Sequence, residues 1–175
     1  RGSTSIRISA RRRIAYSRHR INSSTGNEND GNHASDARGD RVAARIVLCH
    51  AAGFNKEVLY PVIAELERTL RPPAGTCVEL LALDTAGHGR NSTEGRAMEL
   101  PVDHRELARD VLDVVSEAHY SQGCGAGATQ PPLLGVGHSL GGTALAFAEV
   151  LAPATFARLL LFEPIIYPYG KDLVT

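Results

Sequence analysis

The sequence predicts an α/β fold in which helices cover both faces of a mostly parallel sheet. Three observations support this prediction. Between residues 44 and 162, apolar runs of strand length alternate with segments of helical periodicity. The first of these runs, ARIVLC at residues 44–49, is interpreted as a continuous apolar strand, as is typical of a strand buried on both faces of a parallel sheet. The chain has 175 residues, of which 43% are hydrophobic and 22% charged, which is the size and composition of a single globular domain.

Two segments precede this alternating pattern. Residues 1–21 are rich in arginine and place Ile6 and Ile8, then Ile14 and Tyr16, on one face of a period-2 pattern, which predicts a β-hairpin. We expect its arginines on the solvent face or at the turn. Because the segment is also rich in serine and lacks acidic residues, a targeting segment is the alternative. Residues 22–43 are largely polar and predict a flexible surface insertion.

The core elements follow in a regular order over residues 44–175. Apolar runs predict strands at residues 44–49, 76–83, 132–137 and 158–162, and helical periodicity predicts helices at residues 56–70, 102–120 and 140–151. One stripe of the second helix collects the apolar residues Leu107, Val111, Leu112, Val115 and Ala118. Ligands gather at the carboxyl ends of parallel strands, so we expect a site in the segments that follow the predicted strands.

One of these segments matches a catalytic pattern. Residues 137–141, GHSLG, fit G-x-S-x-G between a predicted strand and a predicted helix. Such a turn leaves Ser139 at its apex in a strained conformation, and the glycines on either side allow neighbouring backbone to approach. The helix that follows directs unsatisfied N–H groups and a positive dipole end at the serine. The pattern predicts that Ser139 is a nucleophile; the alternative is a tight structural turn.

A loop of small residues follows the first strand, at HAAGF in residues 50–54. We expect the backbone N–H groups of Ala52 and Leu140 to stabilise an oxyanion there. His50 is interpreted as a residue that hydrogen-bonds the backbone of the loop and holds its shape.

A second loop follows the second strand and reads DTAGHGRNS over residues 84–92. Its composition is typical of a scaffold, in which Asp84 caps backbone donors. We therefore interpret His88 as structural and not as a catalytic base.

In this order and spacing, the strand that ends before His50, the DxxGHGxxS loop and the GHSLGG elbow resemble the α/β-hydrolase superfamily. The resemblance covers about residues 45–168 and implies an α/β-hydrolase fold. More narrowly, HAAGFNKE, GVGHSLGGTALAFAE and LLLFEPII are similar to a fungal-type branch that includes peroxisomal lipase-like proteins and hydrolases of toxin biosynthesis. The match implies that Ser139 is the nucleophile and that Leu140 and Ala52 are the oxyanion-hole donors. Ala51 departs from the family, which usually has glycine after the histidine.

The base that would activate Ser139 is missing. The superfamily order is serine, then acid, then histidine, whereas all seven histidines here, at positions 19, 33, 50, 88, 104, 119 and 138, precede Ser139. We therefore expect the fold to be truncated at its C-terminus, with the catalytic histidine beyond Thr175. Glu163, after the fourth strand, is a candidate acid; otherwise it caps the loop or lines the pocket, and the acid also lies beyond Thr175. We expect His138 to pack under the loop.

The function predicted for the intact protein is that of a serine hydrolase, which cleaves a small-molecule ester or related acyl substrate through an acyl-enzyme on Ser139. A serine at this position argues against dehalogenase or epoxide hydrolase chemistry, for which aspartate would be expected. The alternatives are an acyltransferase with the same nucleophile, and a non-catalytic binding protein or inactive fragment of the same fold. We expect the 175-residue chain alone to be inactive.

Composition bears on metal binding, location, nucleic-acid binding and membrane insertion. Three cysteines at wide spacing, with no CxxC pair, predict neither a zinc site nor a disulfide framework, and neither a metal nor a cofactor is implied. Two of the three lie in apolar runs of strand length, which favours an intracellular location, cytoplasmic or organellar. A net charge of zero does not indicate nucleic-acid binding, and no apolar run is long enough to predict a membrane span. Both chain ends look like cuts, and the address signals that lie at chain ends cannot be read from this sequence. The sequence does not indicate an oligomeric state.

Overall fold

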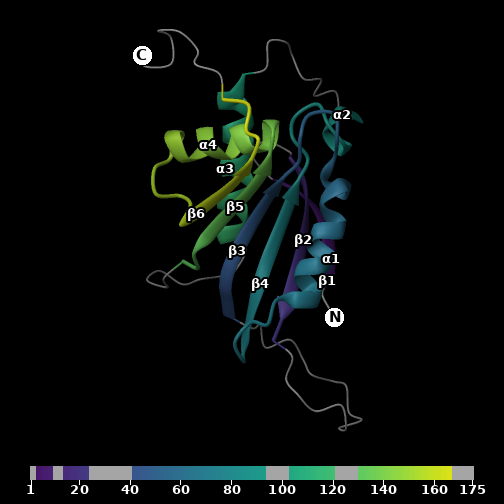
Figure 1. Ribbon diagram of the computed structural model, residues 1–175, viewed down its shortest axis with the longest axis vertical. Helices are drawn as coiled ribbons and strands as arrows, with labels where there is room; N and C mark the ends of the chain where they lie inside the picture. Colours follow the sequence, from purple (N-terminus) through teal and green to yellow (C-terminus); the bar gives the residue numbers. More distant parts are fainter. Residues whose placement is uncertain (1–2, 10–13, 24–40, 94–102, 121–129, 167–175) are drawn as a thin grey trace.

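The computed structural model describes residues 3–9, 14–23, 41–93, 103–120 and 130–166 (Figure 1). Over these ranges the chain forms a six-stranded sheet in the spatial order β1-β2-β4-β3-β5-β6. The strands are β1 (Ser3–Ile8), β2 (Ala15–Asn22), β3 (Arg41–Cys49), β4 (Thr76–Leu83), β5 (Leu133–His138) and β6 (Arg158–Phe162). The helices are η1 (Lys56–Leu59), α1 (Tyr60–Thr69), α2 (Arg90–Thr93), α3 (His104–Tyr120) and α4 (Leu140–Leu151).

The sheet is mostly parallel, which confirms the predicted fold class. Strands β4, β3, β5 and β6 run parallel, whereas β1 and β2 form an antiparallel hairpin and β2 pairs antiparallel with β4. The predicted bounds of β4, β6 and α4 agree with the structure. Strand β3 begins at Arg41 and takes in the end of the expected insertion, whose residues 24–40 lie outside the described ranges. The short helix α2 lies where only a loop was predicted.

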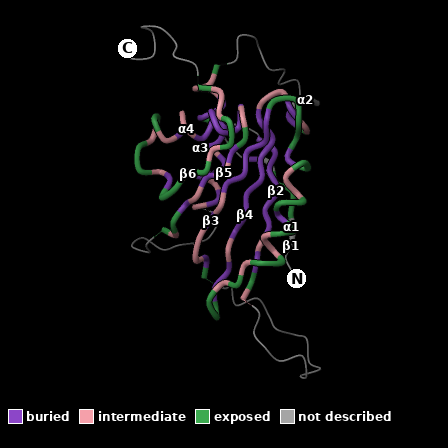
Figure 2. Tube along the Cα trace, in the orientation of Figure 1, coloured by how far each residue is buried: buried purple, intermediate pink, exposed green. Residues whose placement is uncertain are grey.

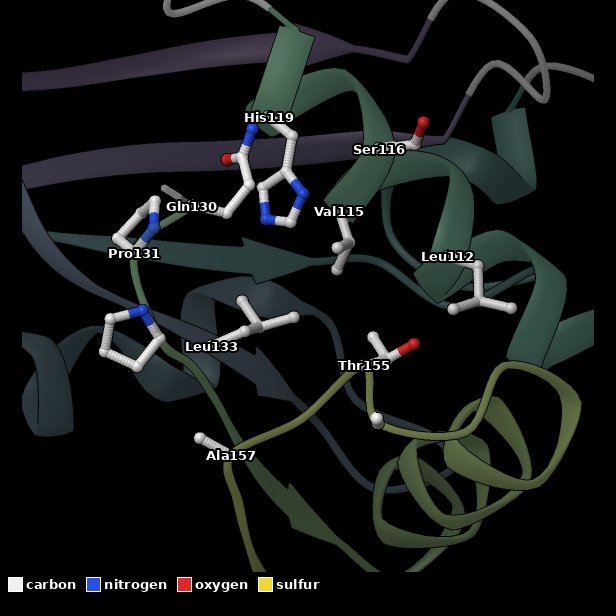
Figure 3. Close-up of a pocket in the computed structure, with 11 residues that line it drawn as sticks. Leu112, Val115, Ser116, His119, Gln130, Pro131, Leu133, Thr155 and Ala157 are labelled. Atoms are coloured by element: carbon white, nitrogen blue, oxygen red, sulfur yellow. The ribbon is translucent and has the colours of Figure 1, made fainter. Parts of the chain in front are cut away.

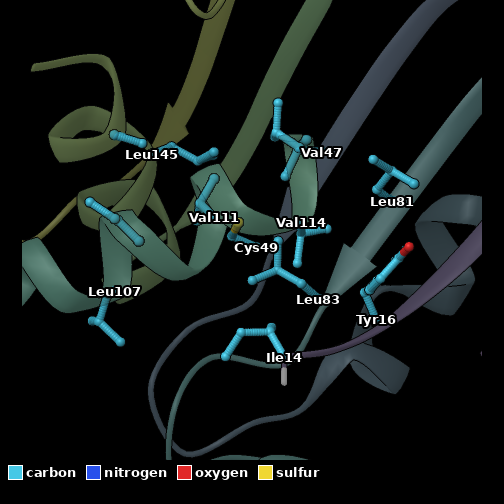
Figure 4. Close-up of a cluster of buried hydrophobic side chains, with 14 of the residues drawn as sticks. Ile14, Tyr16, Val47, Cys49, Leu81, Leu83, Leu107, Val111, Val114 and Leu145 are labelled. Carbon is cyan, nitrogen blue, oxygen red and sulfur yellow. The ribbon is translucent and has the colours of Figure 1, made fainter. Parts of the chain in front are cut away.

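Two hydrophobic clusters hold helices against the two faces of the sheet. On one face, α3 and α4 contribute Val111, Val114 and Leu145, which pack over Val47 and Leu81 (Figure 4). On the other face, α1 packs against β3 and β4, and its Ile63 is buried there beside Leu48 and Leu80. Full burial of side chains of this size stabilises the fold by about 1.5–3 kcal/mol each. The apolar stripe predicted for the second helix is the buried face of α3.

The N-terminal hairpin is confirmed, but its faces differ from the prediction. In the pairing register, Ile6 lies opposite Ser17 and Arg7 lies opposite Tyr16. Side chains directly opposite one another share a face, so Ile6 and Tyr16 lie on different faces of the sheet. Accordingly, Ile6 is 46% exposed while Tyr16 is fully buried. A one-residue shift of register moves every side chain to the other face, and the hydrophobic pattern of this hairpin does not reveal its register.

A buried ionic cluster joins the hairpin to the core and corrects the expected position of one arginine. The buried carboxylate of Glu79 on β4 accepts hydrogen bonds from Arg18 and Arg20 on β2 and from Arg45 on β3. Burial alone would raise the pKa of Glu79, but the hydrogen bonds and charges of its arginine partners hold that pKa below its usual value. Arg18 is therefore buried against a carboxylate instead of facing solvent.

Part of the sheet is uncovered on the α1 side within the described ranges. Leu160 and Phe162 on β6 are 55% and 52% exposed, and β6 lies at the edge of the described sheet (Figure 2). An open edge strand with exposed apolar side chains favours association with other chains. Across the described ranges, no helix has the length and apolar character needed to cross a membrane.

Candidate active site

Ser139 lies at the turn between β5 and α4. Its backbone has φ 50° and ψ −118°, which a non-glycine residue adopts only under strain. Two hydrogen bonds fix the turn: the Ser139 N–H donates to the Phe162 carbonyl oxygen at 2.9 Å, and the Ser139 carbonyl oxygen accepts from the Thr143 N–H at 3.0 Å. Strain of this kind persists where the surrounding structure enforces it and is concentrated at functional sites. The strained turn expected from the sequence is present.

The hydroxyl of Ser139 is not used to build the turn. Ser139 is the N-cap residue of α4, a position where a serine side chain commonly accepts a backbone N–H. Here its side chain makes no capping hydrogen bond. The residue is partly exposed at the carboxyl end of β5. A serine at a helix start commonly uses its oxygen as a cap, whereas this geometry leaves the oxygen available.

The flanking glycines are required by close contacts. A Cβ on Gly137 would lie 2.7 Å from the Cα of Gly142, and one on Gly141 would lie 2.5 Å from the carbonyl oxygens of Cys49 and His50. Real Cβ atoms do not approach backbone so closely, so both positions exclude a side chain. The contact at Gly141 also shows that the start of α4 packs directly on the end of β3, where the HAAGF loop begins.

Two backbone N–H groups near this contact are free within the described residues. Leu140 is the first residue of α4, so its N–H has no partner in the helix. In the HAAGF loop, the Phe54 N–H donates to Ala51 at 3.3 Å and the Gly53 N–H donates to His88 at 2.9 Å, whereas the Ala52 N–H has no acceptor in the described part of the chain. The expected oxyanion-hole donors are thus unpaired N–H groups, one at the start of α4 and one in the HAAGF loop, and the start of α4 packs on the end of β3 where that loop begins.

Ala51 occupies the position at which the family usually has glycine. It is buried and does not adopt a positive φ. Its carbonyl oxygen accepts hydrogen bonds from His50 Nδ1 at 2.8 Å and from the Phe54 N–H at 3.3 Å. The alanine methyl group is therefore accommodated without backbone strain.

His50 and His88 hold the loops in place, as expected from the sequence. His50 donates from Nδ1 to the Ala51 carbonyl oxygen and accepts the Thr85 N–H at Nε2, at 3.2 Å. His88 accepts the Gly53 N–H at Nε2, while its Nδ1 contacts Thr85 Oγ1 and the Ala86 carbonyl oxygen. Burial lowers the pKa of His50 and favours its neutral form. Both nitrogens of each ring are engaged, so neither ring has a free nitrogen to act as base.

Asp84 links the two loops more strongly than the sequence indicated. Its buried carboxylate accepts the Lys56 N–H at 2.8 Å, the Lys56 Nζ at 2.9 Å and the Arg90 N–H at 3.1 Å. The side chain of Lys56 is fully buried and also donates to Glu57 at 2.7 Å. Burial alone would lower the pKa of Lys56, but its hydrogen bonds to Glu57 and Asp84 outweigh this and raise it. Asp84 was predicted as a cap, whereas nothing in the sequence distinguished Lys56 from a solvent-exposed lysine.

Glu163 and His138 lie beside the elbow. Glu163 has a positive φ of 44° and follows Phe162, whose carbonyl oxygen accepts the Ser139 N–H. Its side chain is exposed, and its role as the acid stays a prediction. His138 is also exposed, so the expectation that it packs under the loop is wrong. As the last residue of β5 it lies on the face of the sheet that is uncovered at this end, opposite Phe162 of β6.

The architecture is of the hydrolase-type α/β class. It is defined by the alternation of strands and helices, the strained serine turn and the glycine contacts. The chain belongs to the alpha/beta hydrolase family, whose model matches residues 46–173.

Three similar proteins are consistent with this placement. Protein phosphatase methylesterase 1 of Aspergillus fumigatus is 34% identical over 102 residues, which are 57% of this chain and 22% of that protein. The structure of the peroxisomal alpha-beta-hydrolase Lpx1 of Saccharomyces cerevisiae has a TM-score of 0.64 at 19% identity, over 95% of this chain and 45% of that one. Carboxylesterase CesB of Bacillus subtilis has a TM-score of 0.52 at 16% identity, over 93% and 44%. The chain thus spans less than half the length of each.

Proposed function

We propose that this chain carries the nucleophile of a serine hydrolase that cleaves an ester or related acyl substrate. The observation that carries the proposal is the geometry of Ser139, whose strained backbone holds its hydroxyl clear of capping at the start of α4. In addition, the positive end of the α4 dipole favours developing negative charge beside the serine. A structural turn accounts for the glycine contacts but not for a serine held at positive φ with its oxygen unused.

In this mechanism, Ser139 Oγ attacks the substrate carbonyl carbon and loses its proton to a base. The electron pair of the C=O bond moves onto oxygen, and the N–H groups of Leu140 and Ala52 stabilise the oxyanion. Collapse of this intermediate breaks the ester bond, the base returns the proton to the leaving alcohol, and water then hydrolyses the acyl-enzyme. Loss of one oxyanion donor typically costs about 100- to 1,000-fold in rate.

We place the base, a histidine, beyond Thr175, because the superfamily order is serine, then acid, then histidine. Both ring nitrogens of His50 and His88 hold the loops. Glu163 is the candidate acid that would orient it. The names of the methylesterase and carboxylesterase relatives support an ester as substrate and water as the acyl acceptor. We also propose an intracellular location, on the apolar setting of Cys49 and Cys77 and on the similarity to a peroxisomal protein.

A fluorophosphonate probe tests the nucleophile in the intact protein. We expect the wild type to become labelled and Ser139→Ala to give no label. The matched control is Ser116→Ala, an exposed serine on α3, which should label at the wild-type rate. Equal labelling of wild type and Ser139→Ala would contradict the proposal and favour a non-catalytic member of the family.

A further inference from the structure

Two histidines, His50 and His88, join the HAAGF loop to the loop after β4 in a reciprocal way. His50 lies on the HAAGF loop and accepts the Thr85 N–H of the other loop at Nε2, at 3.2 Å. His88 lies on the loop after β4 and accepts the Gly53 N–H of the HAAGF loop at Nε2, at 2.9 Å. The two rings are in edge contact, with centroids 5.4 Å apart. Each loop therefore carries one imidazole that binds the backbone of the other loop, and we call His50 and His88 the histidine clamp.

The contacts of the histidine clamp define its protonation state. His50 Nδ1 lies 2.8 Å from the Ala51 carbonyl oxygen. His88 Nδ1 lies 2.9 Å from the Ala86 carbonyl oxygen. A carbonyl oxygen can only accept, so each Nδ1 carries a proton, whereas each Nε2 accepts a backbone N–H and carries none. The clamp therefore requires both rings to be neutral, with the proton on Nδ1.

The histidine clamp fixes the two peptide groups on either side of the Ala52 Cα. The Ala51 carbonyl group and the Ala52 N–H belong to one planar peptide, so the hydrogen bond from His50 to that carbonyl also sets the direction of the Ala52 N–H. The Ala52 carbonyl group and the Gly53 N–H form the next peptide, which His88 holds through the Gly53 N–H. A proton added to Nε2 of either ring would turn an acceptor into a donor that faces a backbone N–H. The clamp would then open, and the Ala52 N–H would lose its fixed direction.

The surroundings of the clamp favour the neutral form that it requires. Burial lowers the pKa of His50, and His88 beside it acts in the same direction. The hydrogen bond to the loop backbone and the carboxylates of Asp84 and Glu57 raise this pKa but do not outweigh burial. Lys56 forms an ion pair with Asp84, which limits the attraction of that carboxylate for a proton on His50. The charged residues on the described elements around the clamp are Lys56 and Glu57 of η1, Asp84 of the loop after β4 and Arg90 of α2.

We propose that His50 and His88 are positioning residues that hold the Ala52 N–H toward the oxyanion only while both rings are neutral, so that acid weakens the oxyanion hole. This role rests on the proposed function, because it requires an oxyanion to form at Ser139. Acid would then slow acyl transfer through the loops as well as through the base that activates the serine.

Steady-state hydrolysis of p-nitrophenyl butyrate by the intact protein tests the positioning role. His88→Phe removes the acceptor of the Gly53 N–H, so we expect kcat to fall by about 10- to 100-fold while KM stays within about threefold, because the oxyanion is absent from the bound ester. His88→Gln offers an uncharged amide oxygen to the same N–H and should restore kcat to within about threefold of the wild type. His119→Phe is the matched control, because His119 lies at the other end of the sheet, in the wall of a cavity between α3 and the start of β5 (Figure 3). This control should keep the wild-type kcat.

The pH profile tests whether the rings must be neutral. The base that activates Ser139 also titrates, but it is common to the wild type and His88→Gln, so its titration cancels from the ratio of their kcat values. We expect the ratio of His88→Gln to wild type to rise at least about threefold from pH 8 to pH 5, because glutamine takes up no proton in this range. A ratio that stays constant would overturn the requirement for neutral rings.

Nitrogen NMR of the isotope-labelled wild type is a second measurement, which decides the question if circular dichroism shows that His88→Phe does not fold. At pH 7 both Nδ1 atoms of the clamp should be protonated and both Nε2 atoms unprotonated, and a proton on either Nε2 would overturn the proposal. An unchanged kcat in His88→Phe, or a loss that His88→Gln does not recover, would also overturn it. Failure of the proposed function is a distinct result, since the fluorophosphonate probe would then label the wild type and Ser139→Ala equally.

Discussion

Replacing Asp84 by asparagine tests whether the loop after β4 is a scaffold for the proposed oxyanion hole. The substitution keeps the shape of the side chain but leaves the fully buried ammonium of Lys56 with Glu57 as its partner, and the Glu57 side chain is 44% exposed. Removing one member of a buried ion pair typically costs about 3–5 kcal/mol. Because Glu57 retains part of the interaction, we expect Asp84→Asn to lower the free energy of unfolding by about 3 kcal/mol. The rate of fluorophosphonate labelling should fall too, since Asp84 holds the loop that carries Ala52.

Urea denaturation of the intact protein, followed by circular dichroism, measures this loss. Glu65→Gln is the matched control, because it makes the same chemical change in an exposed ion pair with Arg68 on α1 and should have little effect. The double variant Asp84→Asn with Lys56→Met should be more stable than Asp84→Asn alone, since no unpaired charge is buried. A loss below about 1 kcal/mol for Asp84→Asn, or a double variant that regains nothing, would refute the reasoning.

Three further predictions concern the elbow, pH and the short chain. Gly141→Ala should abolish labelling of Ser139 in the intact protein, because the new methyl group would lie 2.5 Å from two backbone oxygens. Gly142→Ala, whose nearest contact is at 3.2 Å, should become labelled more slowly than wild type but still measurably. Equal labelling of the two variants would contradict this prediction. Burial lowers the pKa of His19, His50 and His119, so below about pH 6.5 the unfolded chain binds protons that the folded chain does not. The free energy of unfolding, measured by urea denaturation, should therefore fall from pH 7 to pH 5.5. A flat profile would be evidence against this prediction. The 175-residue chain alone should aggregate in light-scattering assays and show little or no turnover of p-nitrophenyl esters, and robust turnover would disprove this.

The strands and helices of the core could be predicted because each has a clear local signal. Strand β4 is apolar at all positions except Thr76 and Glu79, and α3 carries its apolar residues at helical spacing, so both can be recognised without knowledge of distant contacts. The N-terminal hairpin could also be predicted as a pair of strands. Which side chains lie on which face could not be predicted, because pairing with β4 sets the faces, and Ile6 was consequently assigned to the wrong face.

The parts of the candidate site that depend on backbone geometry could be predicted. The glycines around Ser139 are needed for contacts with β3 and α4, and such glycines leave a recognisable pattern. The scaffold role of His88 followed from the composition of its loop. The ion pair between Lys56 and Asp84 could not be predicted, since it joins residues from two separate loops and neither side chain has a local pattern that reveals its burial.

The buried nitrogens of Arg45 and His119 that have no hydrogen-bond partner in the described structure could not be predicted from the sequence either. Arg45 lies within an apolar strand and His119 within an amphipathic helix, and each is ordinary in its own element. Only the packing of α3 on the sheet brings the two together.

Trapping the acyl-enzyme tests the central claim most directly. The intact protein, mixed with excess p-nitrophenyl butyrate and quenched in acid within milliseconds, should gain the mass of one butyryl group, and peptide sequencing by mass spectrometry should place that group on Ser139. Neutral hydroxylamine should remove the group, as expected for an ester. A butyryl group on another residue, or ester turnover that persists in Ser139→Ala at the wild-type rate, would contradict the account.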